Sequence, residues 1–201
     1  MELPLFPLNT VLFPGGVLPL RIFEPRYLDM VKDCVRNQSE FVICLIRDGE
    51  EVGKAARHCN IGTACKITDW ETLPEGLLGI TVLGIRRVTI SNVNVQANQL
   101  LLGTVDGLQE NQDEELPAEF NEWAHLVSLI INKLGKPFSE QQFQLNSASW
   151  VGARLTEYLP FELAAKQRIL EIDHPLVRLE HLQDSLEHIE KYYTQGNFKS
   201  Q

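Results

Sequence analysis

The chain has 201 residues, of which 44% are hydrophobic and 22% are charged. This composition supplies a sizeable core and allows either one large domain or two small ones. The formal net charge is −9, with 13 acidic and 10 basic residues in positions 1–110 and 14 and 8 in the remainder. Binding to a nucleic-acid backbone requires a basic surface, so this charge disfavours DNA or RNA as the partner.

The first residues and the cysteines indicate the compartment. The opening sequence MELP lacks both the basic start and the uninterrupted apolar run of a secretory leader. No stretch approaches the roughly 18 apolar residues that a membrane-spanning helix requires. We therefore expect a cytoplasmic protein that does not enter the membrane and whose thiols stay reduced. The thiols are those of Cys34, Cys44, Cys59 and Cys65.

Residues 3–35 predict a strand, a turn, a second strand and a helix in close succession. Residues 14–16 read Pro-Gly-Gly, a turn sequence in which proline presets φ and the glycines accept positive φ. Pro19 lies in the second strand and has no N–H to donate, which places that strand at a sheet edge or a bulge. Pro25 suits the first position of the helix. The expected apolar face of this helix comprises Tyr27, Leu28, Val31, Cys34 and Val35.

Several short strands are expected after this helix. The sequence FVICLI is apolar on both faces, which is typical of a covered strand deep in the core. Gly84 is expected to bend a later strand. Strands at this spacing favour a closed or nearly closed β barrel over a βαβ sheet. The expected strands cover residues 41–46, 61–68, 78–84, 88–95 and 100–105.

The second half of the chain has a helical pattern. The polar run QENQDEE at residues 109–115 predicts a connector, so we expect a β-barrel subdomain at residues 1–110 and a helical subdomain at 111–201. Ser139 begins a Ser-x-x-Gln sequence, the form of a capping box. The tail from residue 195 is expected to fray. The expected helices, about four in number, cover residues 116–134, 150–159 and 161–171 and a segment from Pro175. The expected fold class is α+β.

The second strand and the helix after it carry a pattern that resembles the opening of the Lon protease N-terminal (substrate-binding) domain family. The pattern is Pro-Leu-x-Ile-x-Glu-x-Arg-Tyr, matched here by Pro19, Leu20, Ile22, Glu24, Arg26 and Tyr27. Supporting blocks lie at residues 61–64, 74–76, 82–87, 166–171 and 178–179. The resemblance covers most of the chain. It implies a small PUA-like β barrel with an inserted helix, followed by a helical subdomain, and a role in recognising protein substrates.

No catalytic or metal site is expected. The chain has no G-x-x-x-x-G-K-[ST] loop to cradle nucleotide phosphates. Ser128 and Lys133 occur in one expected helix, but their spacing puts them on different faces, so a protease-type serine–lysine pair is not predicted. His58, Cys59 and Cys65 lack a second C-x-x-C pair, which favours loop polar residues and a buried thiol over zinc. We therefore expect no enzyme activity, metal or cofactor.

Glu24, Arg26 and Tyr27 are candidate binding residues, because a carboxylate and a guanidinium beside an aromatic ring can hold a peptide backbone. The favoured alternative is a structural clamp that satisfies backbone groups where the strand meets the helix. Arg86 and Arg87 are expected on opposite faces of a solvated strand rather than on nucleic acid.

Large aromatic residues are concentrated in the helical half. Exposed beside the barrel, they would form an apolar groove for unfolded segments, whereas core packing is the favoured interpretation. Trp123 and Trp150 are the candidate binding residues among them. The set is Phe120, Trp123, Phe138, Trp150 and Phe161.

We therefore predict a non-catalytic module that binds unfolded or extended polypeptide, or a protease partner, as an adaptor in proteolysis or protein quality control. Binding would use apolar contact and strand addition at an open sheet edge. Two alternatives stay open. An RNA-binding PUA-like protein would need a basic groove, and a small-ligand-binding barrel would hold its ligand in the barrel mouth.

Overall fold

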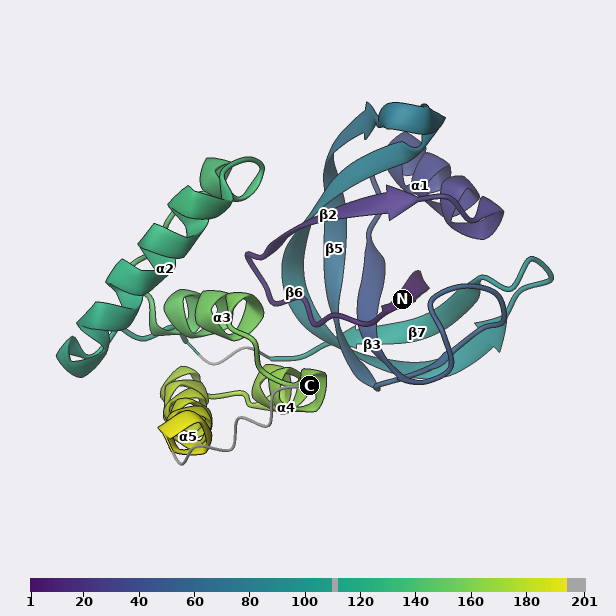
Figure 1. Ribbon diagram of the computed structural model, residues 1–201. Coiled ribbons are helices and arrows are strands. Elements are labelled where there is room, and N and C mark those ends of the chain that lie inside the picture. The colour runs from purple at the N-terminus through teal and green to yellow at the C-terminus, as the bar shows by residue number, and fades with distance from the viewer. Residues whose placement is uncertain (110–111, 195–201) are drawn as a thin grey trace.

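The structure is a computed structural model that describes residues 1–109 and 112–194, apart from the side chains of residues 75 and 188–194. Strands β1–β7 and helix α1 lie on one side of the molecule, and helices α2–α5 lie on the other (Figure 1). The α+β class is confirmed. The predicted boundary between residues 110 and 111 and the predicted tail from residue 195 lie outside the described residues.

The strands are β1 (Glu2–Leu8), β2 (Val17–Ile22), β3 (Phe41–Asp48), β4 (Arg57–His58), β5 (Ile61–Thr72), β6 (Leu78–Val95) and β7 (Leu101–Gly107). The α-helices are α1 (Pro25–Asn37), α2 (Asn121–Leu134), α3 (Ala148–Tyr158), α4 (Leu163–Glu171) and α5 (Pro175–Thr194). Three 3-10 turns connect them at Pro74–Gly76 (η1), Ala118–Phe120 (η2) and Phe138–Glu140 (η3).

Strand β1 closes the sheet on itself. It pairs in antiparallel with β7 and in parallel with β3, while β7, β6, β5 and β3 pair in that order, so these strands form a closed ring of pairings. Among the described strands, β4 pairs only with β3 and β2 only with β6. Strand β2 therefore lies at an edge, as Pro19 predicted, because proline has no N–H to donate to a second neighbour.

Strand β6 is one strand of 18 residues, where the sequence predicted two. Its register with β5 shifts next to Gly84, so a bulge lies where a bend was expected, but the strand continues. The Gly84 N–H donates to the Gly16 carbonyl, and the Gly84 carbonyl accepts from the Gly15 N–H, both at 2.8 Å. A Cβ on residue 84 would lie 2.3 Å from the carbonyl oxygen of Phe13. Glycine thus allows the turn after residue 13 to lie directly against the strand.

Helix α1 begins at Pro25, as predicted, and packs its buried face on the sheet. The Tyr27 ring stacks on Phe6 of β1 with 4.0 Å between ring centroids. Leu28 was expected on this face but is 36% exposed, and Met30 is buried in its place. Residues 27, 31 and 34 define the centre of the buried face. Residue 28 is three positions before residue 31, which places it near this face, but it lies at the border and is therefore partly exposed.

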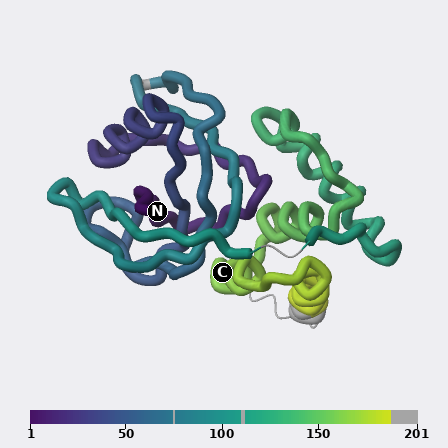
Figure 2. Tube along the Cα trace, turned by 180° about the vertical axis from the view of Figure 1, so that it is seen from behind, coloured from purple at the N-terminus to yellow at the C-terminus, as the bar shows by residue number. Residues whose placement is uncertain are grey.

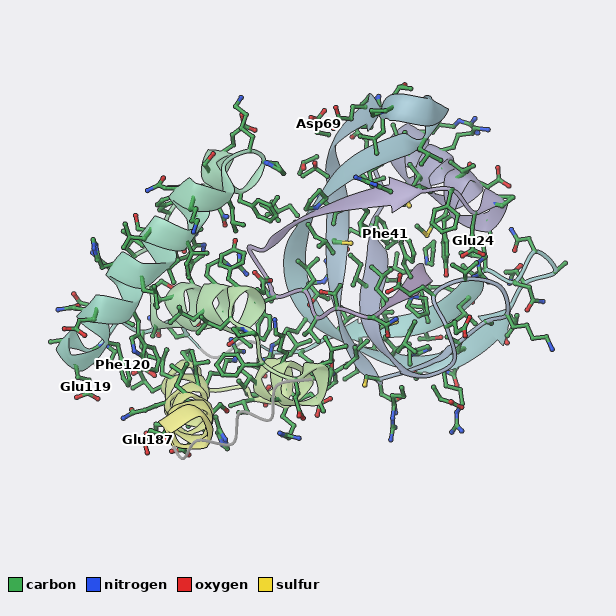
Figure 3. All side chains as sticks on the ribbon, viewed as in Figure 1. Glu24, Phe41, Asp69, Glu119, Phe120 and Glu187 are labelled. Carbon is green, nitrogen blue, oxygen red and sulfur yellow. The ribbon has the colours of Figure 1, made fainter. Side chains whose placement is uncertain are left out.

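Strand β3 is buried on both faces, as its unbroken apolar run predicted. Phe41 and Ile43 pack in the cluster that includes the α1 side chains, and Phe41 points into the space between α1 and the strands (Figure 3). Val42 and Cys44 point to the other face and pack in a second cluster with residues of β1, β6 and β7.

Helices α2–α5 share a core with the strands, since Val11, Phe13 and Leu45 belong to the cluster of the helical half. Ser147 caps α3, with its side-chain oxygen accepting from the Trp150 N–H at 2.8 Å. The prediction that Ser139 caps a helix was wrong, because Ser139 lies inside η3. The chain after η3 is extended, and the Gln141 amide donates back to the Phe138 carbonyl at 2.8 Å.

Arg87 joins β6 to the end of α4. Its side chain is fully buried, which corrects the predicted solvated position. It donates to the carbonyls of Leu170 at 2.9 Å and Ile172 at 3.0 Å, and it pairs with Asp173 at 2.9 Å. The predicted opposite orientation of Arg86 holds, since Arg86 pairs with Glu40 at 2.6 Å. The buried guanidinium is stable here because carbonyls at a helix C-terminus carry partial negative charge.

Candidate functional site

The candidate residues Glu24 and Arg26 form a buried ion pair at the start of α1. Arg26 is 4% exposed and Glu24 is 14% exposed, and Arg26 Nη2 lies 3.0 Å from Glu24 Oε2. Arg26 Nη1 also donates to the carbonyls of Gly53 at 2.8 Å and Gln99 at 3.1 Å. Glu24 in turn accepts from the Gly53 N–H at 3.3 Å. These contacts are those of a clamp that satisfies backbone groups.

Tyr27 completes this cluster on the core side. The Arg26 guanidinium lies over the Tyr27 ring, 4.7 Å from its centroid, in a cation–π arrangement. Burial raises the pKa of Tyr27 to about 12, although the neighbouring Arg26 opposes the increase. The phenol is therefore neutral at physiological pH and acts as a packed ring.

The clamp ties together two surface segments that are distant in sequence. Gly53 belongs to the loop between β3 and β4, and Gln99 belongs to the turn between β6 and β7. Both segments lie on the side of the strands that faces away from α2–α5 (Figures 1 and 2). The sequence predicted the Glu24–Arg26 pair because its members are neighbours, but no local signal identified its partners.

The candidate tryptophans occupy different environments. Trp150 is 5% exposed and packs against Phe143 in the helical core, so its ring is covered. Trp123 is half-buried and packs against Phe120, with 4.5 Å between ring centroids. The structure therefore does not bring Trp123 and Trp150 together with the clamp. Whether these residues contact a ligand stays a prediction.

Next to Trp123, α2 exposes a strip of three leucines, Leu126, Leu129 and Leu134, whose exposure the sequence did not predict. Leu129 is 54% exposed, and Leu126 and Leu134 are 40% and 46% exposed. The buried face of α2 consists of Ala124, Val127 and Ile131. The apolar stripe of this helix is thus wider than the surface that its neighbours cover, a pattern typical of interaction sites.

A cleft of about 610 Å³ lies between one face of β2, β5 and β6 and the chain that follows α2. Pro19 and Arg21 of β2 line one side, and Lys136, Pro137 and Glu140 line the other. This cleft, which includes β2 residues, therefore lies near the end of the leucine strip at Leu134.

A buried ionic network holds the turn after residue 13 to the helical half. Glu157 accepts from the Phe13 N–H at 2.7 Å and pairs with the fully buried Arg154 at 3.0 Å, while Arg154 donates to the Pro14 carbonyl at 3.1 Å. Burial raises the pKa of Glu157 to about 7, and Arg154 limits the increase. Burial likewise lowers the pKa of Lys166, which donates to the Glu157 carbonyl at 2.7 Å.

The other chemical candidates do not assemble into sites. Within the described part of the chain, no group of three or more His, Cys, Asp or Glu side chains is placed to hold a metal ion. Burial raises the pKa of the Cys65 thiol well above its usual value, consistent with the predicted buried thiol. None of the described helices is long and apolar enough to cross a membrane.

The fold and these contacts define a domain in which a ring of strands carries one inserted helix and four further helices. Residues 2–188 match the family model described as the ATP-dependent protease La (LON) substrate-binding domain. The chain belongs to this family.

Solved structures agree with the assignment. A Lon N-terminal domain protein from Xanthomonas campestris is 35% identical, with a TM-score of 0.74 over 92% of this chain and 98% of that chain. The N-terminal domain of the Mycobacterium avium complex Lon protease has a TM-score of 0.60 over 92% of this chain and 97% of that chain. At 16% identity, the latter shows the fold alone.

The curated relatives are longer proteins. The Lon protease of Buchnera aphidicola subsp. Schizaphis graminum is 22% identical over 93% of this chain and 25% of its own length. Lon protease 2 of Myxococcus xanthus is 29% identical over 73% of this chain and 17% of its own length. The chain thus spans a quarter or less of these relatives.

Proposed function

We propose that this chain is a non-catalytic module that binds unfolded or extended polypeptide and delivers it, as an adaptor, to a proteolytic partner. The match of residues 2–188 to a substrate-binding domain family carries this proposal. These two relatives match this chain over a quarter or less of their own length, and their remaining segments lie outside the matched region.

The leucine strip of α2 is the surface that we assign to polypeptide. Its three exposed leucines and Trp123 supply apolar area, and burial of such area drives weak association without requiring charge. The free edge of β2 beside the adjoining cleft offers backbone groups for strand addition, although Pro19 removes one donor. Both features suit a ligand defined by being unfolded rather than by its sequence.

Titration with a labelled, reduced and alkylated protein of near-neutral charge tests this function. We expect dissociation constants of roughly micromolar or weaker, as for transient contacts through a modest apolar patch. Apolar burial changes little between low and moderate salt, so the affinity should be nearly independent of salt. Leu129→Gln should weaken binding, whereas Val177→Gln, at an exposed aliphatic position of α5, should not.

A parallel titration with mixed-sequence RNA tests the alternative. RNA binding through phosphates would weaken steeply as salt increases. Absence of polypeptide binding at tens of micromolar, together with salt-sensitive RNA binding, would replace the proposed function with the RNA-binding one. If the chain is non-catalytic, as proposed, the purified protein should neither hydrolyse ATP nor cleave unfolded casein.

A further inference from the structure

A second surface, on the opposite side of the molecule from α2, has the geometry of a peptide groove. Strand β4 pairs only with β3 among the described strands, so its other edge is open. Strand β6 pairs with β5 only as far as Thr89, and residues 91–95 beyond it are all exposed. A groove of about 800 Å³ lies between these two free edges. We call it the β4–β6 groove.

The walls of the β4–β6 groove differ in chemistry. Arg47, Arg57 and His58 line the β3–β4 side, and Val93 and Val95 line the β6 side. Val93 is 39% exposed and Val95 is 56% exposed, so both present aliphatic surface at the free edge of β6.

The groove has more basic than acidic residues, whereas the chain as a whole is acidic. The chain has 27 acidic and 18 basic residues, but Asp48 is the one carboxylate among the groove residues. No carboxylate lies within ion-pair distance of Arg47 or Arg57 in the described part of the chain. The two guanidinium groups are therefore available to an acidic ligand.

The clamp at the start of α1 connects the two walls of this groove. Arg26 donates to the carbonyl of Gly53, in the loop that carries the groove residues Ala55 and Ala56. It also donates to the carbonyl of Gln99, in the turn that follows β6. Figures 1 and 2 show this loop and this turn side by side, away from α2–α5. The spacing of the two groove walls thus depends on Glu24 and Arg26 as positioning residues.

We propose that the β4–β6 groove binds an extended peptide segment in which acidic side chains alternate with aliphatic ones. A peptide that pairs its backbone with a free edge points its successive side chains to the two faces of the sheet; the long arginine side chains then reach the acidic set from the β3–β4 side, and the valines pack against the aliphatic set. The free edges of β4 and β6 supply backbone partners. This proposal rests on the proposed function and adds to it a class of substrate, peptides with alternating acidic and aliphatic side chains, that the leucine strip of α2 does not select.

Fluorescence anisotropy with a labelled peptide of alternating Glu and Val tests the proposal, with Gln–Val and Lys–Val peptides as controls. The Glu–Val peptide should bind most tightly, and its affinity should fall as salt increases, because exposed charges are screened. N-methylation of alternate peptide bonds should abolish binding, since it removes the donors that strand addition needs. Equal affinity for the Glu–Val and Gln–Val peptides would overturn the proposal.

Matched variants locate the site. Arg47→Glu combined with Arg57→Glu should weaken Glu–Val binding by about tenfold, from two lost attractions and two new repulsions. Lys32→Glu combined with Lys66→Glu makes the same charge change on α1 and β5 and should have no effect. Val93→Thr combined with Val95→Thr should weaken binding but keep its salt dependence. Unchanged binding by the folded arginine variant, checked by circular dichroism, would place the peptide elsewhere and refute the assignment.

The two surfaces fail separately. Leu129→Gln should leave Glu–Val binding intact, and the arginine variant should leave binding of the neutral unfolded protein intact. If the wild-type chain binds the Glu–Val peptide but not the neutral unfolded protein, the role of α2 is refuted; if it binds the neutral protein but not the Glu–Val peptide, the groove is refuted. Stronger competition by a short RNA than by the free Glu–Val peptide would show a polyanion site and overturn the peptide assignment.

Discussion

Replacing Glu24 with glutamine removes the charge that neutralises Arg26 while keeping the size of the side chain. One Glu24 oxygen accepts from Arg26 at 3.1 Å, and the other lies 3.0 Å from the same guanidinium and accepts from Gly53 at 3.3 Å. An amide would set its NH2 group against another donor in either orientation. Removing one partner of a fully buried pair costs about 3–5 kcal/mol. Because Glu24 keeps 14% exposure, we expect the free energy of unfolding to fall by about 2 kcal/mol.

Asp33→Asn is the matched control, since it makes the same chemical change in an exposed ion pair. Asp33 lies 3.7 Å from Arg36, and both side chains are more than 60% exposed, at 66% and 69%. We expect this change to alter stability by less than about 0.5 kcal/mol. Urea denaturation followed by two probes measures both variants. At a slope of about 2 kcal/mol per molar urea, Glu24→Gln should lower the midpoint by about 1 M. Two variants with the wild-type midpoint would refute the clamp.

Three further changes test the junction and the helical half. Arg87→Met should lower the free energy of unfolding by about 3 kcal/mol in urea denaturation, because it removes the donor to the buried Leu170 carbonyl and the charge partner of Asp173; a change below about 1 kcal/mol would contradict the role given to Arg87. Since the pKa of Glu157 is raised in the folded state from 4.5 to about 7, its contribution to stability is complete below pH 4.5 and is lost as pH rises to about 7. Urea midpoints of Glu157→Gln should therefore fall less between pH 5 and pH 8 than those of the wild type, and parallel profiles would exclude Glu157 as the titrating group. Ser147→Ala should lower the melting temperature through loss of about 1 kcal/mol of capping, while Ser139→Ala should leave it unchanged.

The elements that the sequence predicted are those whose signals are local. Pro25 marked the start of α1 because its missing N–H costs nothing at a first helical position, and Pro19 marked an edge strand for a similar reason. The run FVICLI identified β3 as covered on both faces. The mutual contact of Glu24, Arg26 and Tyr27 followed from their proximity in the chain.

The features that the sequence missed depend on distant partners. Arg26 meets carbonyls 27 and 73 residues away, and Arg87 meets Leu170 at a separation of 83 residues. A local pattern shows only that Arg87 alternates with Arg86, not that a helix end covers it. Ser139 and Ser147 both precede plausible helix starts, and only the extended chain between them shows which one caps. The exposure of the α2 leucines was not predicted, because periodicity gives the direction of the apolar face of a helix but not how much of that face the neighbouring elements cover.

The order in which the strands pair has a consequence for synthesis of the chain. The β5–β6 hairpin joins neighbouring segments, so it can form as soon as its residues leave the ribosome. Strand β1, in contrast, needs β7 as its antiparallel neighbour, and the Met1 nitrogen donates to the Val105 carbonyl across a separation of 104 residues. Such distant pairing closes slowly. We therefore expect β1, the first strand to emerge, to wait with one unpaired edge until the last strand of the ring arrives.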